Sequence, residues 1–205
     1  MKCSVIVSVL DSHDFFQRQM RRFQEIMPAN FELIVMDDGS EKPLAFQEPT
    51  PFPFRLIATN DRRPWTSNMA RSQAAKLSKS DYLLMTDIDH VFTREALAAV
   101  ASFSDDMLTF ERRTATGLDE AGVLVVAKSD RLSPHCNTFA IRRDLFARTG
   151  YLEVYRGYGH DHVFRERYKK LVYQGKVSAA KLGPTIFVVP SPPQGFHKLR
   201  RERIA

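Results

Sequence analysis

The sequence predicts a single α/β domain with a mostly parallel central sheet and helices on both of its faces. Short apolar runs alternate with amphipathic helical patterns along the first half of the chain, which is the order that β-α-β units require. The 205 residues are enough for one sizeable hydrophobic core, and the sequence shows no internal repeat. The content of 43% hydrophobic and 26% charged residues is ordinary for a globular protein.

The first half of the chain contains four predicted strands, each a short apolar run that ends at polar or turn-forming residues. They lie at residues 4–10, 31–36, 54–59 and 82–86. After the first strand, apolar residues recur at spacings of four, three and four, which predicts a helix that Asp11 or Ser12 caps and Pro28 ends. Pro64 suits the first turn of a second helix, and Thr93 is the expected cap of a third.

The second half is less regular, and its predicted elements are shorter. Strands are expected at 107–110, 123–127, 138–141 and 185–189. A helical turn at 143–148 ends at Gly150, and residues 131–135 are predicted to form a loop. The glycines of 157–159 form a flexible segment before a helix at 160–173.

Cysteine content and charge limit the cellular setting. Cys3 and Cys136 are too few for a disulfide framework or a thiolate zinc site, and no apolar stretch approaches the roughly 20 residues of a membrane span. We therefore expect a cytoplasmic protein. The net charge is +6, and the C-terminal end around His197 is locally basic. Such an end can contact phosphate groups on a nucleotide, a lipid headgroup or nucleic acid, or it can be a solvated, frayed terminus. Nucleic acid is not an expected partner.

Two carboxylates, Asp87 and Asp89, follow the fourth predicted strand directly. Ligands of α/β sheets collect at the carboxyl ends of the strands. Paired carboxylates at such a place suit Mg²⁺ or Mn²⁺, which in turn can hold phosphates. The alternative is a solvated acidic turn, because a bare Asp-x-Asp is a common pattern.

The second predicted strand also ends in two carboxylates, Asp37 and Asp38, before Gly39. Right-handed β-α-β connections bring the ends of neighbouring strands to one edge of the sheet, so both acidic pairs are expected to line one crevice. A carboxylate there can accept hydrogen bonds from a base N–H or a ribose hydroxyl. An Asp-Gly turn without a ligand is the alternative.

A basic segment follows the third predicted strand. Arg62 and Arg63 stand just before a predicted helix, where arginines and main-chain N–H groups both favour anions. Trp65 can stack on a flat ring. A solvated basic loop with a buried tryptophan is equally compatible with these residues.

At these positions the chain resembles a known family. The segments that carry the likeness in its first half are Asp37-Asp38-Gly39-Ser40, Ala70-Arg71-Ser72-Gln73-Ala74, Ser78-Lys79-Ser80-Asp81-Tyr82 and Asp87-Ile88-Asp89. Together with the strand at 4–10 they are similar to the start of a family 2 inverting glycosyltransferase of the GT-A fold. The usual Asn, Gly, Ala and Gly of that family are replaced by Ser72, Ala74, Ser78 and Ser80. The spacing between the segments is kept.

The second half continues the likeness less closely. Residues 138–146, Gly150-Tyr151 and the segment 157–161 resemble a galactosyltransferase-like C-terminal half. His160 stands where that family often has Glu. The resemblance thus implies one glycosyltransferase domain over 1–205, with a nucleotide-sugar-binding half at 1–92 and an acceptor half with a basic tail at 93–205.

The resemblance implies roles for the acidic residues. Asp38 would contact the nucleotide base, with Asp37 and Val9 beside it. Asp87 would face the ribose or the metal, and Asp89 would bind the metal, Mn²⁺ or Mg²⁺, directly.

It also implies roles for basic residues and for the catalytic base. Arg62 or Arg63 would hold the uracil or the diphosphate, with Arg71 in the same set. Asp161 would be the general base that takes the acceptor's proton. Asp161 follows a predicted flexible segment and opens a predicted helix, whose positive end keeps a carboxylate ionised.

The histidines carry weaker implications. His162 and His197 are candidate metal ligands, although a core or surface role is the simpler interpretation of each. His90 directly follows Asp89, and adjacent strand residues point to opposite faces, so His90 is expected to support the metal rather than bind it.

The predicted activity is transfer of a sugar, with a UDP-sugar as expected donor, to a hydroxyl of a glycan, a lipid-linked or another acceptor. One alternative is a binding module for nucleotide sugars or glycans that has lost catalysis. Another is a sugar nucleotidyltransferase, but such enzymes usually carry a glycine-rich loop and a lysine after the first strand. Here the sequence Leu10-Asp11-Ser12-His13 stands at that place, which disfavours this alternative.

Overall fold

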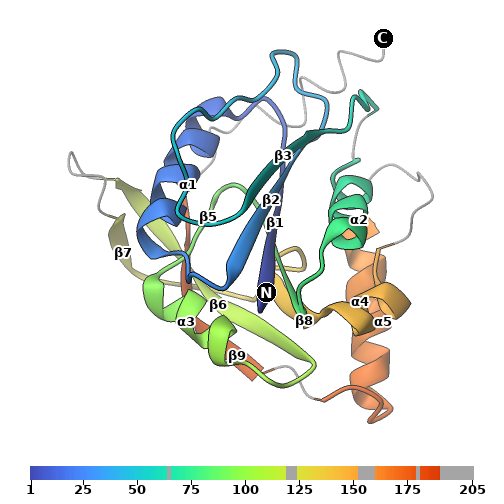
Figure 1. Ribbon diagram of the computed structural model, residues 1–205. Helices are drawn as coiled ribbons and strands as arrows, with labels where there is room; N and C mark the ends of the chain where they lie inside the picture. Colours follow the sequence, from blue (N-terminus) through green and yellow to red (C-terminus); the bar gives the residue numbers. More distant parts are fainter. Residues whose placement is uncertain (64–65, 119–123, 152–159, 179–180, 190–205) are drawn as a thin grey trace.

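The computed structural model describes residues 1–63, 66–118, 124–151, 160–178 and 181–189. These residues form one α/β domain around a sheet whose strand order is β3-β2-β1-β4-β8-β6-β9-β5, with β7 paired to β6 (Figure 1). The strands are β1 Cys3–Val9, β2 Phe31–Asp37, β3 Phe54–Ala58, β4 Tyr82–Thr86, β5 His90–Val91, β6 Met107–Leu118, β7 Leu124–Leu132, β8 Phe139–Arg142 and β9 Lys181–Val188. The helices are α1 His13–Ile26, α2 Ser67–Leu77, α3 Arg94–Ser102, α4 Arg143–Thr149 and α5 His160–Tyr173. The predicted fold class is confirmed.

The first four strands are parallel and fix one functional edge of the sheet. Strand β1 lies between β2 and β4, with Val9 opposite Asp37 and Val7 opposite Thr86. Because all these strands run in one direction, the residues after each of them emerge at the same edge. The rest of the sheet is mixed: β8 is antiparallel to both β4 and β6, whereas β9 is parallel to β6.

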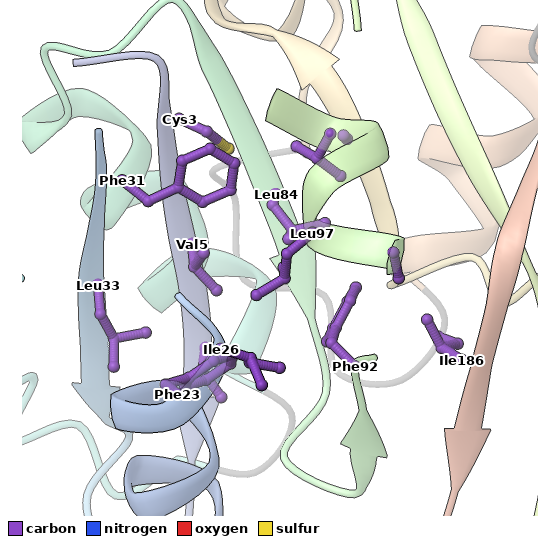
Figure 2. Close-up of a cluster of buried hydrophobic side chains, with 14 of the residues drawn as sticks. Cys3, Val5, Phe23, Ile26, Phe31, Leu33, Leu84, Phe92, Leu97 and Ile186 are labelled. Atoms are coloured by element: carbon purple, nitrogen blue, oxygen red, sulfur yellow. The ribbon is translucent and has the colours of Figure 1, made fainter. Parts of the chain in front are cut away.

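The sheet has a hydrophobic core on each face. Helices α1 and α3 cover one face, and α2, α4 and α5 cover the other (Figure 1). Figure 2 shows the first core, where Phe23 and Leu97 meet strand residues such as Val5. In the second core Phe139 stacks on Phe164 of α5, with ring centroids 4.9 Å apart. Both cores draw on residues from the two halves of the chain, so the halves fold as one unit.

Two serines that depart from the family pattern lie in a buried polar cluster. The Ser4 hydroxyl lies 2.5 Å from the Ser78 hydroxyl and donates to Glu32 Oε1 at 2.5 Å. Ser80 also donates to Glu32 Oε1, at 3.3 Å, and Arg55 Nη2 donates to Glu32 Oε2 at 2.8 Å. The Ser80 hydroxyl is therefore a partner of the buried carboxylate that glycine would remove, whereas the Ser78 hydroxyl contacts Ser4, which itself donates to Glu32.

The helix ends agree with the predictions in part. The Thr93 hydroxyl accepts a hydrogen bond from Ala96 N at 3.1 Å, so the predicted cap of α3 is confirmed. Ser12 precedes α1, but its hydroxyl donates to Leu10 O at 2.7 Å and does not cap the helix. Helix α2 begins at Ser67, later than the predicted start at position 64, which lies outside the described residues.

Several predicted strands of the second half differ from the observed strands in their bounds. Strand β6 continues past residue 110 to Leu118 because β7 and β9 both pair with it. Strand β7 runs to Leu132, into the predicted loop. The two-residue strand β5 was missed, since only its pairing with β9 makes it a strand. None of the helices within the described residues is long and apolar enough to cross a membrane.

Candidate functional site

The candidate site lies at the carboxyl edge of the parallel strands. Asp38 follows β2 and Asp87 follows β4, and both strands flank β1. The main-chain N–H of Asp38 donates to Val9 O at 2.8 Å, which ties the end of β2 to the end of β1. The topology therefore brings the two acidic motifs to one edge, as the sequence predicts. The Val9 side chain is buried in the core, so only its main chain faces this edge.

Asp37 and Asp38 have different surroundings. Both oxygens of Asp37 accept main-chain hydrogen bonds at 2.9 Å, one from Ser40 N and one from Leu44 N. The carboxylate of Asp37 thus holds the shape of the loop that carries Asp38. Asp38 is only 2% exposed, and its Oδ1 accepts a hydrogen bond from the Thr66 hydroxyl at 2.8 Å. This bond links the end of β2 to the start of α2.

Gly39 is required by the shape of the same loop. Its φ of +81° lies in the left-handed region, which residues with a Cβ rarely adopt. A Cβ at this position would also lie 2.2 Å from the main-chain oxygen of Asp61. The loops after β2 and β3 therefore approach each other closely at Gly39.

The two arginines after β3 have different partners. Arg63 forms a two-pronged ion pair with Asp61, with Nη2–Oδ2 at 2.7 Å and Nε–Oδ1 at 3.0 Å. Arg62 is exposed and has no ion-pair partner within the part of the chain that the structure describes. Arg62 is therefore the better placed of the two to meet an anionic ligand. Trp65 lies outside the described residues.

A buried arginine holds the first carboxylate of the Asp-x-Asp motif. Arg71 of α2 is 2% exposed, and its Nη2 donates to Asp87 Oδ1 and, at 3.3 Å, to Thr86 O. The second oxygen of Asp87 lies 3.0 Å from His135 Nδ1. His135 Nδ1 also lies 3.4 Å from the main-chain N of Asn137, but the shorter contact indicates that the ring N–H donates to Asp87. Asp87 is thus fixed on both sides.

His90 completes a cluster with these two residues. Its Nδ1 shares a hydrogen bond with the Thr138 hydroxyl, and its ring packs edge-on against His135 with centroids 5.1 Å apart. Asp87, His90 and His135 each offer one ligand atom, and these atoms lie within 4.8 Å of one another. One carboxylate oxygen and two imidazole nitrogens at this spacing are a donor set that fits a divalent cation.

The charges of the cluster are strongly perturbed. Burial raises the pKa of Asp87, but the Arg71 charge and the hydrogen bond from His135 outweigh burial and hold this pKa well below its usual range. Burial lowers the pKa of His90 to about 4, although the charge of Asp87 opposes this effect. At neutral pH the cluster therefore presents an ionised carboxylate beside a neutral imidazole.

Asp89 is not a member of this cluster as found among the described residues. It is partly buried, and its main-chain oxygen accepts a hydrogen bond from Val189 N at 2.9 Å. The next residue, His90, is in β5 and is 2% exposed. Among the described residues, the group whose spacing could hold a cation includes Asp87 and not Asp89.

Two residues at this edge were missed in the sequence. His135 was treated as a loop residue before a strand, because nothing local links it to Asp87. Arg112 of β6 lies near the same place: burial lowers its pKa, whereas the charges of Asp87 and Asp89 raise it. Its Nε donates to Ser133 O at 2.7 Å. The sequence offers two signals for His135. Histidine is a residue type that can bind a metal, and His135 comes shortly before the strand that pairs with β4.

The remaining predicted residues are only partly placed. Helix α5 begins at His160, so Asp161 and His162 lie in its first turn, as predicted. The structure describes only the backbone of these two residues. His197, the basic tail and the glycine segment 157–159 lie outside the described residues.

The fold is an α/β domain whose acidic residues gather at the carboxyl edge of its parallel strands. The profile of Glycosyl transferase family 2 matches residues 4–109, which is more than half of the chain. The chain belongs to this family. No curated protein sequence matches the chain. The match ends in β6, so the predicted galactosyltransferase-like character of the second half stays a prediction.

Solved structures confirm the GT-A fold. The structure of S. aureus TarS 1-349 superposes with a TM-score of 0.65 and 15% identity over 92% of this chain. The same fragment in complex with UDP-GlcNAc gives a TM-score of 0.66 and 17% identity over 97% of this chain. The complex with UDP gives a TM-score of 0.65 and 16% identity over 94% of this chain. The chain spans about 60% of the length of these fragments and 37% of a longer TarS structure.

Proposed function

We propose that this chain is a metal-dependent, inverting glycosyltransferase that moves a sugar from a UDP-sugar to an acceptor hydroxyl. The observation that carries the proposal is the meeting of the Asp38 loop and the Asp87 cluster at one edge of a family 2 domain. TarS binds UDP and UDP-GlcNAc, which supports a uridine nucleotide as the donor's leaving group. The proposed pathway class is polysaccharide or glycoconjugate synthesis.

The residues of the first half would bind the nucleotide. Asp38 would accept a hydrogen bond from the base, and Thr66 would hold its carboxylate in place. Asp37 would shape the loop around Asp38. Arg62 would meet the diphosphate or the uracil edge, since Arg63 is paired with Asp61.

The residues around the Asp-x-Asp motif would serve the leaving group. Departure of a nucleoside diphosphate leaves negative charge on the phosphate oxygens, and a bound Mn²⁺ or Mg²⁺ supplies Lewis-acid neutralisation of that charge. Asp87 is ionised and fixed for this role, and His135 lies beside it. Arg71 would keep Asp87 charged and aimed at the edge.

The acceptor's proton would pass to Asp161. A single displacement at the sugar carbon inverts its configuration, and the attacking hydroxyl loses a proton as the new bond forms. Asp161 in the first turn of α5 has the positive end of the helix behind it, which favours the ionised form that a base requires.

The direct test is a hydrolysis and transfer screen of nucleotide sugars with EDTA, Mg²⁺ or Mn²⁺. We expect turnover of a UDP-sugar only when a divalent metal is present. Binding of UDP-sugars without turnover under every metal would show a binding module instead. Turnover in EDTA equal to that in Mn²⁺ would remove the metal requirement from the proposal.

Two substitutions in α5 test the base. Asp161→Asn should retain UDP-sugar binding and reduce transfer by at least about 10²-fold, the usual scale for losing a general base. Glu166→Gln is the matched control, because Glu166 lies in the same helix and is 62% exposed. It should leave transfer unchanged. Full transfer by Asp161→Asn would remove Asp161 from this role.

We also propose that the protein acts in the cytoplasm, where its acceptor is a glycan or a lipid-linked hydroxyl. The basic end of the chain would then contact an anionic membrane surface. Sedimentation with vesicles that contain about 30% anionic lipid, at low and high salt, tests this contact, since charge-driven binding is lost as salt screens it.

A further inference from the structure

We propose that Asp87, His90 and His135 form the metal centre of this protein, and that it takes Mn²⁺, Co²⁺ or Zn²⁺ in preference to Mg²⁺. This inference rests on the proposed function, since it names the ligands of the metal that function requires. It differs from the expectation carried by the sequence, in which the two carboxylates of the Asp-x-Asp motif hold the ion.

The first argument is the convergence of three donors from separate parts of the chain. Asp87 follows β4, His90 opens β5, and His135 lies in the loop before β8. Their ligand atoms lie within 4.8 Å of one another. Pairing of β4 with β8 and of β5 with β9 brings these segments together, so the cluster is a product of the fold rather than of sequence proximity.

The second argument is the spacing of two of the donors. Two ligands at right angles on one ion, each about 2.1 Å from it, lie about 3 Å apart. Asp87 Oδ2 and His135 Nδ1 are 3.0 Å apart. Atoms at this distance can also share a hydrogen bond. Binding of an ion to His135 Nδ1 would therefore displace the proton that lies between His135 and Asp87.

The third argument is that groups outside the cluster orient the donors. Buried Arg71 holds the other oxygen of Asp87, and the Thr138 hydroxyl holds Nδ1 of His90. Metal-binding histidines and carboxylates in proteins are oriented by outer hydrogen bonds of this kind. Because Nδ1 of His90 is hydrogen-bonded to Thr138, Nε2 is the ring nitrogen that remains to bind the ion.

The loop that carries His135 also contains a buried amide oxygen. Asn137 lies between His135 and Thr138, and its Oδ1 is buried without a hydrogen-bond partner in the described structure. Buried polar atoms in folded proteins rarely lack a partner. A bound ion or its water in this loop would supply one.

The donor chemistry selects the ion. Mg²⁺ takes oxygen ligands almost exclusively and keeps several of its waters, whereas imidazole nitrogen suits the first-row transition ions. A site with two imidazoles and one carboxylate therefore discriminates against Mg²⁺. The nearby positive charges of Arg71 and Arg112 lower the affinity for every divalent ion, but they do not change the order among them.

The test uses untagged full-length protein, stripped with EDTA, and no nucleotide. Co²⁺ is added while the visible absorption bands of nitrogen-ligated cobalt are followed, and Mn²⁺, Zn²⁺ and Mg²⁺ are compared by competition and calorimetry. We expect one equivalent of Co²⁺ to bind, and about a 100-fold excess of Mg²⁺ to leave the bands unchanged because magnesium does not favour imidazole. Displacement of Co²⁺ by equimolar Mg²⁺ would overturn the inferred selectivity.

Substitutions assign the ligands. His135→Ala is the main variant because His135 is partly exposed at the site edge, and it should weaken Co²⁺ binding by at least about 10-fold. His13→Ala is the histidine control, since His13 contacts Lys42 O away from the cluster. Asp89→Asn should retain Co²⁺ binding. Loss of binding in Asp89→Asn with retention in His135→Ala would overturn the proposal.

A chemical readout covers a His135 variant that fails to fold. Cys136 follows His135 and is partly exposed, so its alkylation by iodoacetamide should slow when the native protein binds Zn²⁺. Unchanged alkylation at saturating Zn²⁺ would contradict the site. Because these readouts need no sugar donor, a protein that binds the ion but transfers no sugar would refute the proposed function and leave this inference standing.

Discussion

The guanidinium of buried Arg71, from α2, donates a hydrogen bond to Asp87 at the end of β4. This pair joins a helix on one face of the sheet to the acidic motif at its edge. It gives the arginine of the Ala70-Arg71 segment a structural role. A charge placed inside a fold requires a fixed partner, and here the partner is a site residue.

Removal of Arg71 should therefore destabilise the whole domain. We expect Arg71→Met to lower the free energy of unfolding by about 3–5 kcal/mol, because it removes the permanently charged partner of a largely enclosed Asp87 and leaves it only the contact with His135. Urea unfolding followed by circular dichroism measures this change. The matched control is Arg148→Ala, whose pair with Asp144 is exposed and 3.3 Å long, and which should cost less than about 0.5 kcal/mol. Equal effects of the two substitutions would contradict the buried pair.

Two glycines with positive φ offer a controlled comparison. Gly39→Ala places a Cβ 2.2 Å from Asp61 O, whereas a Cβ at Gly175 meets nothing within 4 Å. Gly175→Ala should cost about 1 kcal/mol from backbone strain alone. Gly39→Ala should cost at least about 1 kcal/mol more, because the Asp61 loop must also move. Thermal or urea unfolding of both variants separates the two effects, and UDP affinity should fall only for Gly39→Ala.

Substitutions of Thr66 test whether its hydrogen bond to Asp38 holds the nucleotide end of the site in place. Thr66→Val keeps the shape but removes the donor to Asp38 Oδ1, now 2.8 Å away. We expect a loss of about 1 kcal/mol in stability and a UDP affinity roughly 3- to 10-fold weaker, as the freed carboxylate turns from the base. Thr66→Ser should restore UDP binding by calorimetry. Weak binding in Thr66→Ser as well would indicate packing rather than hydrogen bonding.

Local sequence patterns predicted the parallel half of the fold well. Strand β4 was placed at its observed bounds because its apolar run ends sharply at Asp87. The edge shared by Asp38 and Asp87 followed from strand order alone. The long strand β6 and the short strand β5 were not predictable in this way, since their pairing with β9 joins residues far apart in the chain.

The residues of the candidate site divide in the same way, into those that local sequence patterns predict and those that long-range strand pairing brings in. The acidic residues were predictable because they directly follow apolar strands, where a carboxylate is costly to bury without a partner. His135 gave no such signal, because its closeness to Asp87 depends on the antiparallel pairing of β8 with β4. His90 was expected to support a metal, yet the structure places it in the cluster itself. A pattern within one strand cannot show which residues of another strand lie opposite.

The link between Asp106 and Ser178 should make stability depend on acidic pH. Ser178 donates twice to Asp106 Oδ2, from its main-chain N at 2.7 Å and from its hydroxyl at 2.9 Å. The main-chain bond is the largest cause that lowers the pKa of Asp106 below its ordinary value of 3.8. The folded state therefore favours the ionised form, so the stabilisation is complete above pH 3.8 and is lost as the pH falls through the lowered value.

Asp106→Asn measures that contribution together with the ion pair between Asp106 Oδ1 and Arg142 Nη1, which are 3.1 Å apart. We expect it to lower the free energy of unfolding at pH 7, and the difference from the unsubstituted protein to shrink as the pH is taken below 3.8. Urea unfolding at pH 7, 5 and about 3 measures this, because linkage ties the slope of stability to the difference in bound protons. Asp105→Asn is the control: it removes a neighbouring charge without touching the bonds to Ser178, and it should change stability at pH 7 by less than about 0.5 kcal/mol. A difference for Asp106→Asn that stays constant over this range would show that the carboxylate acts through its shape and not through its charge.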